Sequence, residues 1–300
     1  MICLNKALFL THGNPVGISN LVSRIRSTSL SSTAVLSTFD NSYYYVGQVL
    51  HQPGNRSAYF SFVLPDFSGR AENLDVLIEF LCTKAGEMGA LNVLAEIEES
   101  HSLFDILRSV GFSVFSWESF WKLPDSVPDN QPVAAWSAPS VTDENTARSL
   151  FQTLVPPLVQ NAEPFTNGGT PRAVYKKEGE TLAYVEIHNG AEGIYLIPVI
   201  HPSVEDIPSL LHGLIRYFES PGRPVYLQVR SYQAWLSDAL ADIQAAPSPR
   251  FALLVKHLAI GNPLLLKQAQ RVRSDSRQAE PTAPIVQTYQ ENQVPAKGTK

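Results

Sequence analysis

GALNVLAEIEESHSLFDILRSVGFSVFSWESFWKL, residues 89–123, is the stretch that decides the fold. Val93, Ala95 and Ile97 place apolar side chains at every second position, which predicts a short strand. The residues that follow place apolar side chains three and four apart, at Leu103, Ile106, Leu107 and Val110. This spacing predicts an amphipathic helix, and the aromatic segment 113–123 predicts a further strand after it.

The pattern that precedes this stretch recurs later in the chain. A shift of 137 residues places His51 on His188 and Leu74 on Leu211, and no gap is needed over residues 49–81. Each copy predicts two strands joined by a tight turn, a loop and a helix, followed by a strand, a second helix and a closing strand. The apolar faces of the first helix in each copy are Leu74, Leu77, Ile78, Leu81 and Ala85, and Leu211, Leu214, Ile215 and Phe218.

We therefore expect two tandem α/β domains, residues 1–123 and 134–263. Each is expected to be a mixed, mostly antiparallel sheet flanked by helices. Between them, residues 124–133 hold three prolines, which deny both helix and strand hydrogen bonds, so an exposed linker is predicted. Residues 264–300 are poor in apolar side chains and predict a disordered tail.

Composition excludes several classes of function. The formal net charge of −5 leaves no basic surplus for neutralising phosphates, so no nucleic-acid partner is expected. Two cysteines, Cys3 and Cys82, make neither a disulfide framework nor a thiolate-rich metal site. No stretch reaches the ~20 apolar residues of a membrane span, and the run Ala7–Leu10 is too short for the apolar core of a signal peptide. A cytoplasmic protein without membrane contact is predicted, and its oligomeric state is left open.

Gly89-Ala90 precedes the strand that contains Val93 and Ile97, and Gly111-Phe112 precedes the aromatic strand 113–123. With these two pairs, the order of elements resembles the GNAT superfamily of acyl-CoA N-acyltransferases. In that family a Gly-Ala pair precedes the fifth strand and a Gly-Phe pair precedes the sixth. The resemblance covers roughly residues 5–123 and, more loosely, residues 134–260. It implies transfer of an acetyl or other acyl group from acyl-CoA to a small-molecule amine or to a protein amino group.

The resemblance also implies where a cofactor would bind. The pantetheine arm lies where the fourth strand separates from the fifth, here at Val63 and Leu64, and the pyrophosphate sits on backbone amides of the next loop. The corresponding loop residues are Ser68, Gly69, Arg70 and Ala71. Asp66 and Glu72 in the same loop repel a pyrophosphate, and the loop 203–208 of the second copy has neither glycine nor a basic residue.

The catalytic pattern of the family is eroded in this sequence. Its usual tyrosine acid corresponds to Leu107, and its usual asparagine to Ser100. Candidates for a base that deprotonates the amine are Glu98, Glu99 and His101, which follow Glu96 at the end of the fifth strand. Carboxylates at a strand end are also common surface residues. Two hypotheses therefore stand: an N-acyltransferase, or a non-catalytic descendant that binds a ligand or protein in the groove between the domains.

Overall fold

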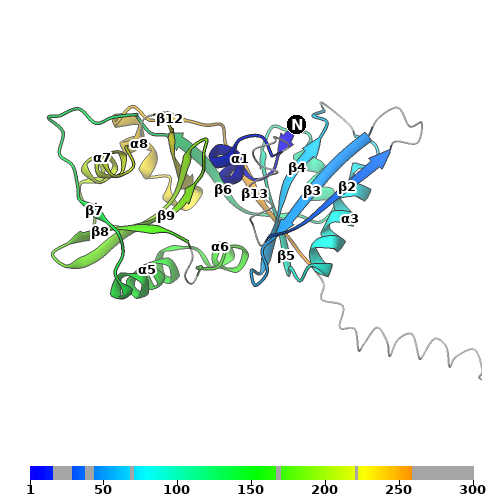
Figure 1. The fold of residues 1–300 in the computed structure, drawn as a ribbon, viewed down its shortest axis with the longest axis horizontal. Coiled ribbons are helices and arrows are strands. Elements are labelled where there is room, and N and C mark those ends of the chain that lie inside the picture. Colours follow the sequence, from blue (N-terminus) through cyan, green and yellow to red (C-terminus); the bar gives the residue numbers. More distant parts are fainter. Residues whose placement is uncertain (16–28, 38–43, 68–70, 167–169, 220–221, 259–300) are drawn as a thin grey trace, which may run out of the picture. The chain divides into compact units, whose positions relative to one another are not determined.

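The computed structural model describes residues 1–15, 29–37, 44–67, 71–166, 170–219 and 222–258 (Figure 1). Within these residues, 13 strands form one mixed sheet and seven α-helices flank it, which confirms the predicted fold class. The first half contains β1 (Ile2–Cys3), α1 (Lys6–His12), β2 (Leu30–Ser37), β3 (Tyr44–His51), β4 (Ser57–Leu64), α3 (Leu74–Glu87), β5 (Asn92–Glu98), α4 (Leu103–Ser109) and β6 (Ser113–Lys122).

The second half repeats this order. It contains β7 (Trp136–Ser137), α5 (Val141–Leu154), α6 (Pro157–Ala162), β8 (Arg172–Lys177), β9 (Glu180–Asn189), β10 (Ile194–Ile200), α7 (Ile207–Tyr217), β11 (Val225–Arg230), a 3-10 turn η1 (Ser231–Gln233), α8 (Leu236–Asp242), β12 (Ala246–Pro247) and β13 (Phe251–His257). In both halves an antiparallel hairpin, β3–β4 or β9–β10, leads to a helix and then to a parallel neighbour, β5 or β11. The repeat inferred from the 137-residue shift therefore has the same topology in both copies.

The closing strands of the two halves are exchanged. Strand β6 of the first half pairs antiparallel with β11 of the second, and β13 of the second half pairs antiparallel with β5 of the first. The two exchanged strands also pair with each other. The sheet consequently runs without a break in the order β2-β3-β4-β5-β13-β6-β11-β10-β9-β8-β7.

Two helices reinforce this exchange by contacting the opposite half. The carbonyl of Thr11 at the end of α1 accepts the N–H of Glu192 in the β9–β10 turn, at 2.9 Å. The carbonyl of Ala162 at the end of α6 accepts the hydroxyl of Ser57 at the start of β4, at 2.7 Å. Each half is thus held by a strand and a helix that the other half supplies.

The helix faces lie as their spacing predicts. The α3 residues Leu74, Leu77 and Leu81 are buried with α4 against the first half of the sheet, and Leu211 and Leu214 of α7 are buried with α8 against the second. Residues 124–133 contain no helix or strand. The boundaries at 123 and 134 stay predictions, and the predicted tail 264–300 lies outside the described residues.

Cutting the chain between the halves should not separate them. A protease site placed within residues 124–133 breaks only the linker, whereas the exchanged strands keep their pairing with β5 and β11. We expect the cut protein to elute from size exclusion at the volume of the uncut chain and to part into two fragments only in denaturant. Two separate fragments under native conditions would contradict the exchange.

Candidate functional site

The position at which β4 and β5 separate is filled by the chain itself. The two strands pair in parallel only from Ser57 to Tyr59. Beyond that point the main chain of Leu4 enters between them. Its N–H donates to the carbonyl of Ser61 at 3.0 Å, and its carbonyl accepts the N–H of Glu96 at 3.0 Å. The backbone groups that the separation would leave free are therefore satisfied by Leu4.

The matching gap in the second half is filled differently. Strands β10 and β11 pair in parallel over Ile194–Leu196. Pro198, further along β10, has no N–H, and its carbonyl accepts the side-chain amide of the buried Gln233 at 2.7 Å. At the start of α7 the N–H of Ser209 is already capped by the carboxylate of Asp206 at 3.0 Å. The carbonyl of Pro198 and the N–H of Ser209 are therefore both already occupied.

The residues predicted to bind the cofactor occupy varied environments. Val63 is buried and paired on both sides, with Gly47 of β3 and Ile2 of β1, whereas Leu64 pairs with Val46. Ala71 packs partly buried against the first core. Three further predicted residues, Ser68, Gly69 and Arg70, lie outside the described residues. The phosphate-binding role of this loop stays a prediction.

The residues predicted as bases lie together at the end of β5, in contact with other surface groups. Glu98 accepts the hydroxyl of Ser100 at 2.7 Å, and Glu99 lies 3.5 Å from Arg250. His101 accepts the N–H of Leu103 at its Nδ1 and lies 3.3 Å from Asp66 at its Nε2. Exposed pairs of this kind contribute little to stability and hold no specific geometry. A catalytic role for the three stays a prediction.

A buried charge cluster that the sequence analysis does not assemble lies across the exchanged strands. Glu118 of β6 accepts the amide of Gln228 of β11 and lies 3.4 Å from Nε of Arg230. The same guanidinium donates to Glu163, after α6, at 2.6 Å. Glu96 of β5, on the same face of the sheet, accepts the main-chain N–H of Lys6. Both halves thus contribute side chains to one polar cluster.

Several atoms of this cluster have no hydrogen-bond partner. They are Oε1 of Glu118, Oε1 of Gln228, Nη1 of Arg230 and the hydroxyl of Tyr195. Tyr195 belongs to the same face because it pairs with Tyr226, two residues before Gln228 on β11. All four side chains are buried. Buried polar groups in folded proteins almost always find a partner, which can be a buried water, so these four atoms mark a position where water or another polar molecule would bind.

Burial also shifts the titration of the carboxylates. It raises the pKa of the Glu96 carboxyl well above its usual range, and the nearby Glu118 carboxylate raises it further. Burial likewise raises the pKa of Glu118, although the Arg230 guanidinium opposes this effect. Because the two groups interact, they titrate as a pair.

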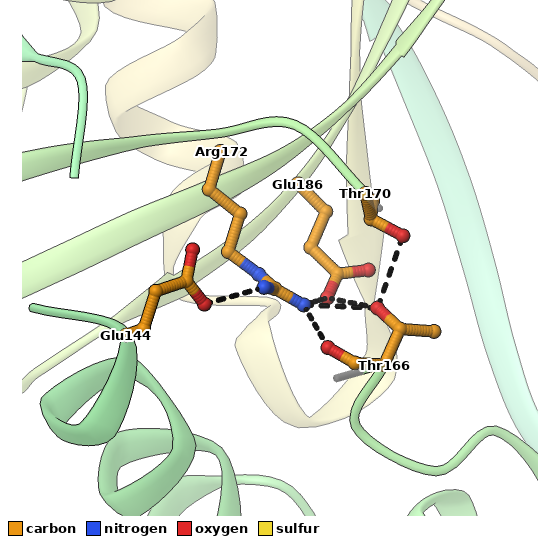
Figure 2. Close-up of polar contacts among 5 residues, drawn as sticks. All are labelled: Glu144, Thr166, Thr170, Arg172 and Glu186. Atoms are coloured by element: carbon orange, nitrogen blue, oxygen red, sulfur yellow. Dashed lines mark hydrogen bonds and ion pairs between the residues drawn. The ribbon is translucent and has the colours of Figure 1, made fainter. Parts of the chain in front are cut away.

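A second cluster of ion pairs, around the buried Arg172, fixes the second half (Figure 2). Its guanidinium donates to Glu144 of α5 and Glu186 of β9, both at 2.7 Å, and to the carbonyl of Thr166 at 2.8 Å. The ring of Phe165 lies against the same group, 4.2 Å from its carbon. The arginine therefore joins a helix, two strands and the segment after α6, which makes it a structural clamp.

Strand order, the two parallel pairs and the flanking helices together define a GNAT fold in two tandem copies. A GCN5-related N-acetyltransferase from Kribbella flavida matches 80% of this chain and 93% of its own, with a TM-score of 0.53 and 13% identity. A tandem GNAT protein from the clavulanic acid biosynthesis pathway matches 86% of this chain and 94% of its own, with a TM-score of 0.50 and 13% identity. A GCN5-related N-acetyltransferase from Sphaerobacter thermophilus matches 81% of this chain and 87% of its own, with a TM-score of 0.50 and 14% identity.

These matches confirm the resemblance at the level of the fold. No family model and no curated protein matches the sequence. Among the described residues, no helix has the length and apolar character needed to cross a membrane.

Replacing Glu96 by glutamine should stabilise the protein, and more so as pH rises. The pKa of Glu96 is higher in the folded protein than in the unfolded chain. At low pH the carboxyl is protonated in both states and costs the wild type no stability. As pH rises from the ordinary carboxyl range towards the raised pKa, the unfolded chain loses the proton first, so the free energy of unfolding falls. We expect Glu96→Gln to gain about 1 kcal/mol or more at about pH 8 and almost nothing at about pH 4, measured by urea unfolding. A gain that is larger at the acidic end would contradict the assigned direction.

Removing the Arg172 guanidinium should destabilise the second half strongly. Arg172→Met leaves Glu186, which is largely buried, without its cation, so we expect the free energy of unfolding to fall by about 3 kcal/mol. The double variant Arg172→Met/Glu186→Leu should recover most of this loss, because no buried unpaired charge remains and Glu144, 38% exposed, is solvated by water. A double variant as unstable as the single one would show that the loss comes from packing alone.

Proposed function

We propose that this chain is a non-catalytic GNAT-fold protein that binds a small polar ligand at the cluster of Glu118, Gln228 and Arg230, between its two halves. One observation supports the absence of catalysis. In both halves the carbonyl at the strand separation already accepts a hydrogen bond from the chain, from Leu4 in the first half and from Gln233 in the second. In the GNAT family that position is where the cofactor's pantetheine arm lies. Its residues do not fit an acyl-CoA here.

The energetic cost of admitting a pantetheine arm supports this proposal. Leu4 is 1% exposed, and withdrawing such a leucine side chain from a core costs about 2 kcal/mol. Two main-chain hydrogen bonds, to Ser61 and from Glu96, would be lost as well. In the second half, Pro198 offers a ligand no donor, and displacing Gln233 would leave a buried amide unpaired.

The unsatisfied atoms of the cluster indicate the chemistry of the ligand. The oxygens of Glu118 and Gln228 accept, the guanidinium nitrogen of Arg230 donates, and the hydroxyl of Tyr195 does either. Around them, the three carboxylates of Glu96, Glu118 and Glu163 outnumber the guanidinium of Arg230 and the ammonium of Lys6. A small ligand that both donates and accepts hydrogen bonds, and that is neutral or positively charged, complements this arrangement.

An acyl-CoA-dependent N-acyltransferase, acting on a small-molecule amine or a protein amino group, is the second candidate. Glu96 favours it: a buried carboxylate with a raised pKa is suited to take a proton from an amine near neutral pH. This candidate requires the cofactor to bind away from the two filled gaps. For either function we propose a cytoplasmic location, which the free, buried Cys3 and Cys82 support.

Calorimetry with acetyl-CoA and with desulfo-CoA separates the two candidates. We expect no heat of binding from either compound, and no release of thiol from acetyl-CoA in the presence of amines. Binding accompanied by thiol release that Glu96→Gln abolishes would establish the second candidate and overturn the first.

The ligand site is tested by a thermal-shift screen of small polar compounds. A compound that raises the unfolding temperature of the wild type should lose its effect in Gln228→Leu, which removes one acceptor at the cluster. The surface variant Arg250→Ala serves as the matched control and should retain the shift. A stabilising compound that is unaffected by Gln228→Leu would place the site elsewhere.

A further inference from the structure

The two halves differ at the outer ends of the sheet. In the second half, β7 pairs with the outer edge of β8, so Trp136 lies opposite Tyr175. In the first half the corresponding strand, β1, pairs with β4 instead. Strand β2 is consequently the terminal strand of the sheet, and no strand covers its outer edge within the described residues (Figure 1).

The sequence of β2 lacks the features that normally protect an edge. It reads LSSTAVLS, residues 30–37, with no charged residue and no proline, and Val35 on it is 64% exposed. The equivalent strand β8 reads RAVYKK, residues 172–177, with three basic residues. Charges and prolines keep exposed edges from pairing with other strands, so β2, which has neither, is open to pairing.

The helix beside this edge adds an apolar flank. Helix α3 packs on β2 and β3. On one flank of α3, Glu79 reaches Lys256 of β13 at 2.6 Å. Phe80 lies on the opposite flank, on the β2 side, and is 48% exposed, whereas Val76, 53% exposed, lies on the outward face of α3 one turn earlier. Leu30, on the same face of the sheet as the buried Ala34, extends this apolar surface to the edge itself.

We infer that β2 pairs with β2 of a second copy of this chain. An antiparallel pair about a twofold axis that places Thr33 opposite its own counterpart joins the two sheets edge to edge, and the twofold brings the two α3 helices together on one face. Phe80 then packs against its counterpart. This occupant is favoured over a single peptide strand because a peptide would complete the edge but leave the α3 flank exposed.

Charge also favours a second copy. An edge without charge offers nothing to attract a charged peptide, and it can meet an identical edge without local repulsion. The net charge of −5 on each chain opposes the approach of two copies at long range. Added salt screens that repulsion, so the dimer should tighten as ionic strength rises.

The test is the molar mass in solution, by light scattering during size exclusion and by sedimentation over a range of concentrations. We expect the wild-type chain of 33.0 kDa to run at twice that mass. Thr33→Lys places a charge beside the axis, and Phe80→Glu places one in the helix contact, so each should give a monomer. Tyr217→Glu, at the exposed α7 position that matches Phe80 in the 137-residue repeat, is the control and should remain dimeric.

All three substitutions are at exposed positions, so the variants should fold. An unchanged far-ultraviolet circular dichroism spectrum checks that they do. A wild-type chain that is monomeric at every concentration would overturn the inference. A dimer that persists in both Thr33→Lys and Phe80→Glu would also overturn it, since the interface would then lie elsewhere. A monomer that instead captures an added peptide copy of residues 30–37 would assign the edge to a foreign strand.

Discussion

The reciprocal exchange of β6 and β13 is the constraint on which the rest of the structure depends. Each half lacks its last strand and obtains it from the other, so neither sheet is complete alone. The exchange puts the side chains of β5, β6 and β11 on one continuous face. Glu96, Glu118 and Arg230 lie close together for this reason, although they come from different halves. The ends of α1 and α6, each bound to the opposite half, hold that face in place.

The two copies keep a common plan and differ in how they close it. In both, the strand after the hairpin separates from its parallel neighbour after three residues of pairing. A main-chain segment at Leu4 fills one separation and a side chain, Gln233, fills the other. The use of β1 for this purpose removes it from the outer edge of the sheet, where the second copy keeps β7. One displacement thus changes both the interior gap and the edge.

The order and type of the elements could be predicted from the sequence, because they depend on local spacing. The apolar residues of α3 and α7 repeat every three and four positions and are buried as that spacing requires. Strand exchange could not be predicted, since 113–123 and 250–260 have similar apolar patterns and either one satisfies the same neighbour. The placement of β1 was missed for a similar reason: two residues carry no periodicity.

The candidate site shows the same division between local and non-local information. The carboxylates at the end of β5 could be located in the sequence, but periodicity does not show that Glu118 is buried beside Arg230, because these residues are far apart in the chain and meet only through the exchange. The one signal in the sequence was Glu118 itself, a carboxylate in the middle of a strand rich in aromatic residues, SVFSWESFWKL. Its meaning depends on the strand across from it, which the sequence does not identify.

The exchange also bears on how such a chain can vary over generations. Two identical polypeptides that trade their last strands would form the same continuous sheet, and every substitution would then appear on both sides of the axis. Joining the copies in one reading frame removes that coupling. A carboxylate such as Glu118 can arise opposite an arginine, while its counterpart in the second copy, Phe251, remains apolar. The covalent link thereby allows a charged, asymmetric centre in a scaffold whose symmetry would otherwise duplicate every buried charge.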